Sequence, residues 1–331
     1  MTEGISVVIP NYNGSHLLAQ TLPTVLLALV QSSKQYEVIV VDDCSTDDSV
    51  PYLQCNYPLI KIIKNSKNSG FSVTANAGIF SALYNKVLLL NSDVKLEVDY
   101  FDRQLTYFNN PNTFGVMGRI IGWDDEHIQD AAKYPKMQGS KIKTNGNYYL
   151  KNEDDMKDGI FTTYLSGANA LFDTKKFKQI GGFDELFSPF YAEDTELSLR
   201  AWRLGWTCYY DHFSVCRHKT SATISTSQRK NFVNCIYDRN KMYLHAIHLQ
   251  GWQKALWLLQ LIPETFLRLI TFRWHYLKSV YIFATTQKKI ALSRQRFKAL
   301  SKTYSNNLTV KEVYAKILKP IENKEIVVWK N

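Results

Sequence analysis

The 331-residue chain has little glycine, little proline and few cysteines. Its 15 glycines and 9 prolines are too few for a fibrous or low-complexity protein. Its 5 cysteines are an odd number and form no Cys-x-x-Cys pair, which argues against a disulfide framework or a thiolate zinc site. A reducing cytosol is the simplest setting for such a chain. Hydrophobic residues make up 45% of it, which is enough for a sizeable core and excludes wholesale disorder.

Membrane-targeting signals are also missing. The amino terminus carries Glu3 and no basic segment ahead of a long apolar run, so we expect no secretory signal peptide. The stretch 4–33 contains no charged residue, but Pro10, Asn11 and Pro23 are among the residues that interrupt it. Its apolar part is shorter than the roughly 20 residues that a membrane span needs. We therefore predict no transmembrane helix.

Two nucleotide-binding signatures are absent. A dinucleotide-binding fold would place a G-x-G-x-x-G turn after its first strand, where this chain has Pro-Asn-Tyr-Asn-Gly at residues 10–14. The P-loop pattern G-x-x-x-x-G-K-[ST] does not occur in the sequence. These absences disfavour a Rossmann dehydrogenase and exclude a P-loop enzyme.

The positive charge is concentrated at one end of the chain. The whole chain has 40 basic and 30 acidic residues, a net charge of +10. Residues 251–331 hold 15 basic and 4 acidic residues, so residues 1–250 hold the remaining 25 and 26 and are close to neutral. This asymmetry predicts a domain boundary, with a near-neutral domain at 1–245 followed by a basic, aromatic, helical region at 246–331.

Short apolar segments alternate with longer helix-like segments in the first hundred residues. The apolar segments are rich in Val, Ile and Leu without polar alternation, which is typical of parallel strands buried on both faces. We predict strands at 5–9, 37–41, 60–63 and 87–90, and crossover helices at 15–31, 47–53 and 72–83. The series indicates an α/β fold with a mostly parallel sheet.

The signals beyond residue 100 are less regular. Polar loops are expected around 122–130 and 145–158, and two further strands at 161–165 and 168–172. A helix is expected at 192–204, after a glycine turn. In parallel sheets ligands bind beyond the carboxyl ends of the strands, so the residues after each strand are the candidates for a site. Here they are 10–13, 42–45, 65–70 and 91–93.

These segments resemble the family 2 glycosyltransferases of GT-A fold. Seven motifs carry the resemblance, in the family's order: SVVIPNYNG, EVIVVDDCSTDDS, NSKNSGFSVTANAGI, LLLNSDV, LSGANALF, GGFDELF and AEDTELSLRAW. They extend over about residues 4–245, and seven in order are far more specific than any one. The resemblance implies an inverting enzyme that transfers a sugar from a nucleoside-diphosphate sugar.

The resemblance also implies a donor pocket at the strand exits. Asp43 would accept a hydrogen bond from the base, as a carboxylate can from the imide N–H of uracil or thymine. The alternative for Asp42 or Asp43 is a capping role at the helix that starts near residue 47. The donor-binding set implied by the family is Pro10, Tyr12, Asp42, Asp43, Asn68, Gly70, Asn76, Asn91 and Ser92.

A divalent cation, Mn²⁺ or Mg²⁺, is implied at the Asp-x-Asp position of the family, which Asn91-Ser92-Asp93 occupies here. Carboxylate oxygens hold such hard cations against a diphosphate. The first Asp is replaced by Asn, so Asp93 is the one carboxylate left in the motif. His218 follows Asp194 at a spacing similar to that of the family's metal-binding histidine, and its imidazole would suit Mn²⁺ better than Mg²⁺.

The family's general base falls on Asp194, with Glu193 as a supporting residue. Inverting transfer needs a base that takes the proton of the acceptor hydroxyl. The alternative is that both are ordinary acids in a first helical turn, where they complement the helix dipole. The wall around the donor sugar and the acceptor is assigned by resemblance to Gly167, Gly182, Phe183 and Asp184.

The remaining expectations concern partners. Arg239-Asn240 resembles a pair in rhamnosyltransferase-like members, so a dTDP-sugar stands beside a UDP-sugar as donor. The expected acceptor is a glycan or lipid-linked glycan in surface polysaccharide synthesis. A sugar nucleotidyltransferase is the first alternative, but it would need a glycine-rich signature that residues 10–14 lack. A non-catalytic membrane-surface scaffold with a degenerate transferase fold is the second.

The basic C-terminal region allows two interpretations that the sequence leaves open. Trp, Tyr and Phe interleaved with Lys and Arg on helices are typical of a membrane-surface segment. The same residues could instead pack on the catalytic domain or in a homodimer. No nucleic-acid-binding motif occurs, so no nucleic acid partner is expected. The predicted location is the cytoplasm, with peripheral contact at the inner face of the membrane.

Overall fold

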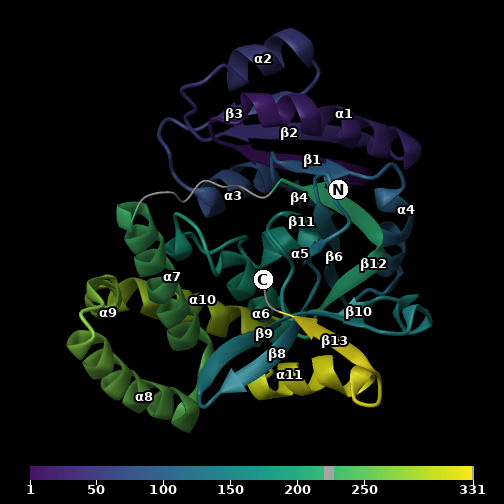
Figure 1. Ribbon diagram of the computed structural model, residues 1–331. Helices are drawn as coiled ribbons and strands as arrows, with labels where there is room; N and C mark the ends of the chain where they lie inside the picture. Colours follow the sequence, from purple (N-terminus) through teal and green to yellow (C-terminus); the bar gives the residue numbers. More distant parts are fainter. Residues whose placement is uncertain (220–226, 330–331) are drawn as a thin grey trace.

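A computed structural model of the chain describes residues 1–219 and 227–329 (Figure 1). Within these ranges, most strands belong to one large sheet. Its strands are β1 (Thr2–Asn11), β2 (Tyr36–Asp42), β3 (Lys61–Lys64), β4 (Tyr84–Leu90), β5 (Val94–Leu96), β6 (Thr113–Gly122), β7 (Ile128–Asp130), β10 (Ile160–Phe161), β11 (Asn169–Asp173) and β12 (Thr207–His218). Their order is β10-β12-β6-β11-β4-β1-β2-β3, with β5 beside β12 and β7 beside β6.

The first four strands confirm the predicted parallel arrangement. β1 pairs in parallel with β2 on one side and with β4 on the other, and β2 pairs in parallel with β3. Alternate residues of β1 enter different cores: Ile5, Val7 and Ile9 pack on one face of the sheet and Val8 on the other. Both faces are therefore buried, as the unbroken apolar segments predicted.

Helices cover both faces of this sheet. α1 (Ser15–Gln31) and α4 (Tyr100–Gln104) share one core, while α3 (Phe71–Ser81), α5 (Thr174–Gln179) and α6 (Glu193–Arg203) share the other. α2 (Ser49–Asn56) lies beside α1 (Figure 1). The predicted helices at 15–31, 72–83 and 192–204 agree with these bounds to within about two residues.

The region 100–160 differs from the expectation. It holds β6, and a smaller sheet in which β8 (Ala132–Gln138) pairs with β9 (Lys141–Leu150). The loop expected around 145–158 was therefore wrong for its first part, which is the end of β9. The strand expected at 161–165 is reduced to the last residue of β10, because the chain leaves the sheet to form the turn before β11.

The C-terminal region is helical, as predicted, and it ends in a strand. α7 (Ser227–His248), α8 (Gly251–Ile270), α9 (Trp274–Thr285), α10 (Gln287–Thr303) and α11 (Val310–Leu318) lead to β13 (Ile326–Trp329). β13 pairs antiparallel with β9, so the chain returns to the smaller sheet (Figure 1). No helix within the described ranges has the length and apolar character needed to cross a membrane.

Candidate active site

β1, β2 and β4 are parallel neighbours, so their carboxyl ends lie at one edge of the large sheet, where the predicted Asp42 and Asp43 follow β2. Asn11 donates a hydrogen bond to the carboxylate of Asp42 over 3.2 Å. The other oxygen of Asp42 accepts the backbone N–H of Ser45 over 3.0 Å. Asp42 is buried, so its carboxylate fixes the turn after β2.

The neighbouring carboxylate, Asp43, holds the loop before α3. One oxygen accepts hydrogen bonds from the Asn65 side chain (2.8 Å) and the Ser69 backbone (2.9 Å). The other accepts the backbone N–H of Gly70 over 2.9 Å. A carboxylate has about four lone-pair sites, so the oxygen bonded to Gly70 can accept one more donor, such as a base.

The residues around Asp43 differ in exposure. Tyr12 is 53% exposed just past β1, Asn68 is exposed in the loop, and Pro10 is partly buried. Gly70 has a φ of +85°, and a Cβ there would lie 2.7 Å from the backbone of Pro189. The Phe71 backbone also donates to the Pro189 carbonyl over 2.9 Å. The loop beside Asp43 is thus fastened to the segment that precedes α6.

The two predicted metal ligands lie next to each other. Nε2 of His218, at the end of β12, is 3.5 Å from a carboxylate oxygen of Asp93. The Nδ1 atom of His218 is 2.8 Å from the amide oxygen of Gln129, which orients the imidazole so that Nε2 faces Asp93. Asn91 and Ser92 are held by their backbones, through Ala168 and the Thr21 hydroxyl.

A carboxylate and an imidazole nitrogen are donors that Mn²⁺ accepts. Within the described residues there is no group of three or more His, Cys, Asp or Glu side chains that could hold a metal. The two donors that lie together, a carboxylate oxygen of Asp93 and Nε2 of His218, would fit a cation that completes its shell with water and donor phosphates.

A cavity of about 290 Å³ adjoins His218. It is lined by Ile120, Gln129, Asp130, Lys133, Ser166, Ala168 and His218. Gly167 lies between two of these lining residues, and a Cβ there would meet the Phe71 ring at 3.1 Å. A glycine at this position therefore lets the backbone beside the cavity approach the Phe71 ring closely.

Lys133 connects this cavity to the predicted base. It is buried in β8, forms an ion pair with Asp130 and lies 2.6 Å from the Asn147 side-chain oxygen. Burial lowers the pKa of Lys133 to about 7, while the charge of Asp194 acts in the opposite direction. Lys133 in turn favours the ionised form of Asp194.

α6 begins with a pair of carboxylates, of which Glu193 is buried and Asp194 is half-buried. Burial raises the pKa of Asp194, and its hydrogen bond from the Thr195 backbone (2.6 Å) opposes that shift. Burial, followed by the charge of Asp194, raises the pKa of Glu193 to about 8. The Oε2 atom of Glu193 has no hydrogen-bond partner among the described residues. Because the pKa of Glu193 is raised to about 8, Glu193 carries a proton at neutral pH.

The loop that precedes Glu193 and Asp194 has a strained backbone, and side chains of α7 hold this loop in place. Tyr191 and Ala192 have positive φ values of 75° and 68°, which cost about 1–3 kcal/mol each outside glycine. The Asn240 side-chain amide of α7 donates to the carbonyls of Phe187 (2.6 Å), Phe190 (2.9 Å) and Tyr191 (2.8 Å). Arg239 adds a hydrogen bond to the Ser188 carbonyl over 2.6 Å.

Asn76, Gly182, Phe183 and Asp184 form a second cluster. The Asn76 amide exchanges two 2.9 Å hydrogen bonds with the backbone of Phe183. The Phe183 ring is buried against Phe71 and Phe177, and Asp184 caps the short turn that follows it. These side chains hold the turn in place, and they border a separate cavity of about 790 Å³ that Arg239 also lines.

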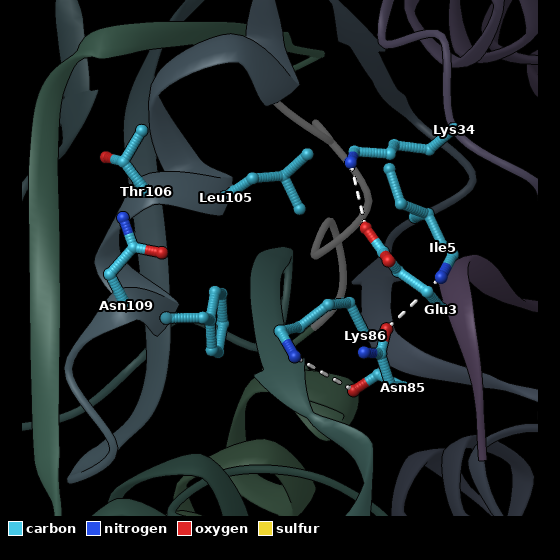
Figure 2. A pocket seen from close by; sticks show the side chains of 10 residues that line it. Glu3, Ile5, Lys34, Asn85, Lys86, Leu105, Thr106 and Asn109 are labelled. Atoms are coloured by element: carbon cyan, nitrogen blue, oxygen red, sulfur yellow. Dashed lines mark hydrogen bonds and ion pairs between the residues drawn. The ribbon is translucent and has the colours of Figure 1, made fainter.

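Another hollow, of about 350 Å³, lies at the opposite end of β1 and β4 (Figure 2). Its charged side chains are already paired: Lys34 contacts Glu3 at 2.9 Å, and Lys86 lies 3.8 Å from Asp173. Figure 2 shows Asn85 and Lys86 side by side on its floor, beside Glu3. This hollow is at the amino ends of the parallel strands and contains none of the predicted residues.

Sequence reasoning missed two lysines whose charges act on Asp194, Lys133 and Lys241. Lys241 of α7 also favours the ionised form of Asp194, and burial lowers its own pKa. Lys133 sits in a strand that the sequence did not predict. Asn240 was predicted only as part of a rhamnosyltransferase-like pair. Its hydrogen bonds to the loop before α6 could not be predicted, because an asparagine next to an arginine on a helix does not indicate such contacts.

The fold and this edge define the class of protein. Solved structures with the same fold include GalNAc-T7 with UDP, GalNAc and Mn²⁺, at a TM-score of 0.63 and 14% identity over 97% of this chain and 57% of that one. A mannosyltransferase from Pyrobaculum calidifontis with GDP-Man and Mn²⁺ matches at a TM-score of 0.54 and 14% identity, over 97% and 86%. The chain has the GT-A fold of nucleotide-sugar transferases, with added C-terminal helices.

The sequence matches the model of Glycosyl transferase family 2 over residues 6–181, and the chain belongs to that family. Chondroitin synthase of Escherichia coli is 28% identical over 233 residues, 63% of this chain and 33% of that protein. An N-acetylglucosaminyl-diphospho-decaprenol L-rhamnosyltransferase of Mycobacterium tuberculosis is 24% identical over 245 residues, 67% of this chain and 78% of that one. The match thus spans only about a third of the chondroitin synthase.

Proposed function

We propose that the chain is an inverting glycosyltransferase that moves a sugar from a nucleoside-diphosphate sugar to a glycan or lipid-linked acceptor. Asp194 is the general base, and Asp93 and His218 hold a divalent cation, Mn²⁺ or Mg²⁺. Asp43, with Pro10 and Tyr12, receives the base of the donor. Residues 1–245 form the catalytic domain, and residues 246–331 position this domain at the membrane.

One observation supports this proposal: Lys133 lies beside His218 in one cavity and also acts electrostatically on Asp194. His218 lines the 290 Å³ cavity together with Lys133. Lys133 interacts electrostatically with Asp194. A diphosphate held at Asp93 would therefore leave its sugar near the carboxylate that must act on the acceptor. The retained base also favours an enzyme over a non-catalytic scaffold.

In the reaction, Asp194 accepts the proton of the acceptor hydroxyl. The acceptor oxygen forms a bond to the anomeric carbon, while the bond from that carbon to the diphosphate oxygen breaks. The electron pair leaves with the nucleoside diphosphate, and inversion follows from attack opposite the leaving group. A bound divalent cation neutralises negative charge on the diphosphate.

The surrounding residues prepare Asp194 for this step. The charges of Lys133 and Lys241 favour the ionised form of its carboxylate against the effect of burial. Glu193, whose pKa is raised to about 8, is protonated at neutral pH and adds no second negative charge. Asn240 and Arg239 hold the loop that fixes where Asp194 points. These are the conditions for a base that is buried but still able to accept a proton.

The similar proteins suggest the class of substrates. The relatives include a rhamnosyltransferase and a putative teichuronic acid biosynthesis glycosyltransferase of Bacillus subtilis, 34% identical over 106 residues. We propose a UDP- or dTDP-sugar donor and a role in surface polysaccharide synthesis. We place the reaction in the cytoplasm, at the inner face of the membrane.

A donor panel tests the proposal. UDP-, GDP- and dTDP-sugars are incubated with the protein and Mn²⁺, with and without a chelator, and the release of nucleoside diphosphate is measured. We expect turnover of at least one donor that stops when the metal is chelated. The enzyme proposal fails if no nucleotide sugar binds or turns over.

A further inference from the structure

Helix α8 has its polar and apolar faces reversed relative to a helix that packs on a protein. Its protein-facing side is largely polar. Glu264 forms an ion pair with Lys141 and lies 3.5 Å from the Tyr276 hydroxyl. Trp257 is the buried exception, and its ring stacks on His245 with centroids 5.3 Å apart.

The outward side of α8 is apolar. Within α8, which the structure describes completely, every exposed residue is apolar or glycine. The large exposed side chains are Trp252, Leu256, Leu258, Leu259, Ile262, Phe266, Leu267, Leu269 and Ile270, which we call the α8 face. Several of them are more than 60% exposed, including Leu259 (61%), Ile262 (66%) and Phe266 (63%). A contiguous patch of this kind marks an interaction surface.

The turn from α8 to α9 extends the same surface. Phe272 is 71% exposed and Trp274 is 63% exposed, with exposed Arg273 between them. Figure 1 shows α8 and α9 at the rim of the molecule, far from β1, β2 and β3. Aromatic rings beside a cation are the residues that favour the headgroup level of a bilayer.

The charges around the α8 face indicate its partner. Residues 251–285 contain four basic residues, Lys254, Arg268, Arg273 and Lys278, and one acidic residue, Glu264. The charge of Glu264 is already matched by Lys141. The partner that complements an apolar face with a net positive rim is a surface with an apolar interior and negative headgroups. A second copy of the chain would bring two positive rims together.

We propose that the α8 face lies in the headgroup region of a membrane that contains anionic lipid. α8 lies along the surface, since its polar side faces the protein and its apolar side faces outward. We infer the membrane contact from the side chains of α8 alone. The purpose of this contact, which is to bring the transferase site to a lipid-linked acceptor, rests on the proposed function.

The test is flotation of the full chain with vesicles in the absence of donor. Vesicles of phosphatidylglycerol and phosphatidylcholine are compared with vesicles of phosphatidylcholine alone. The variant L259Q/I262Q/F266Q removes apolar side chains from the α8 face. We expect it to bind the anionic vesicles at least roughly tenfold more weakly than the wild type.

A matched control removes the same number of exposed apolar side chains elsewhere. Leu27, Val30 and Leu59 are 62%, 63% and 99% exposed and lie in or near α1 and α2. L27Q/V30Q/L59Q should bind vesicles like the wild type. R273Q/K278Q should weaken the preference for anionic over neutral vesicles by a few-fold.

Three results would overturn the inference. The wild-type protein does not float with anionic vesicles, or L259Q/I262Q/F266Q floats with them as well as the wild type does. In the third, light scattering shows a dimer that L259Q/I262Q/F266Q dissociates while vesicle binding is unchanged. Donor hydrolysis is measured in parallel without vesicles, so a loss of transfer chemistry and a loss of membrane binding are told apart.

Discussion

The site around α6 and the surface along α8 place polar and apolar side chains in opposite ways. At the start of α6, Glu193 and Glu196 are buried and Asp194 is half-buried. Along α8, large apolar side chains face outward. Both arrangements cost stability unless something compensates for them. We interpret the acids at the start of α6 as part of the catalytic site. We interpret the exposed apolar side of α8 as the surface that places the enzyme at a membrane.

Among the variants that test the site around α6, we expect the largest effect from Asp194→Asn. It keeps the shape and removes the proton acceptor, so single-turnover transfer at saturating donor should fall roughly 10³-fold. The control Asp102→Asn changes an exposed acid in α4 and should leave the rate unchanged. A wild-type rate in Asp194→Asn would contradict the assignment of the base.

The next largest effect separates structural from catalytic acids within α6. Glu196 lies 2.5 Å from Arg200 and 3.2 Å from His248. Burial alone would raise the pKa of Glu196, but the charge of Arg200 and the hydrogen bond with His248 lower it to about 2. Glu196→Gln leaves the buried Arg200 without its carboxylate, so the free energy of unfolding should fall by about 3–5 kcal/mol. Urea unfolding measures this, with exposed Glu153→Gln as the control. An unchanged unfolding free energy would show that the pair is not needed for folding.

A smaller effect is expected from the loop clamp. Asn240→Ala frees the carbonyls of Phe187, Phe190 and Tyr191, so Asp194 should lose its fixed position. We expect kcat to fall roughly 10–100-fold with little change in donor KM. Asn234→Ala, at an exposed position of the same helix, should behave like the wild type. If KM rises and kcat stays constant, Asn240 does not position the base.

The smallest effect concerns pH. The pKa of Glu193 is about 8 in the fold against 4.5 as its ordinary value, so the folded state binds the proton more tightly than the unfolded state. Stability should therefore fall as pH rises through 8, by on the order of 1 kcal/mol between pH 7 and 9. Glu193→Gln should remove this part of the dependence. The measurement is Tm against pH for both proteins, and identical slopes would contradict the shifted pKa.

The sequence predicted the first half of the fold well because those strands are buried on both faces. Ile5–Ile9 and Val87–Leu90 are unbroken apolar segments, and the structure places them side by side. β8 and β9 were missed because β8 contains Pro135 and β9 contains a polar stretch with a glycine at 143–147. Their stability comes from pairing with each other and with β13, which no local pattern reveals.

The candidate site was predictable where a motif sits at a strand exit. Asp93 and His218 lie far apart in the sequence, yet they are 3.5 Å apart in the structure. The roles of Asn76 and Phe183 in holding a turn were not predictable, because they depend on a contact between α3 and the segment after α5. Lys133 was missed for the same reason, since only the tertiary fold brings its charge close enough to act on Asp194.

Nucleotide binding with and without Mn²⁺ is the most direct test of the proposed site. Calorimetry with UDP and dTDP would compare the wild type with Asp93→Asn and His218→Ala. The account predicts that Mn²⁺ tightens binding of at least one nucleotide by roughly tenfold or more, and that each substitution removes most of that gain. Nucleotide binding that is absent, or that responds neither to Mn²⁺ nor to these substitutions, would contradict it.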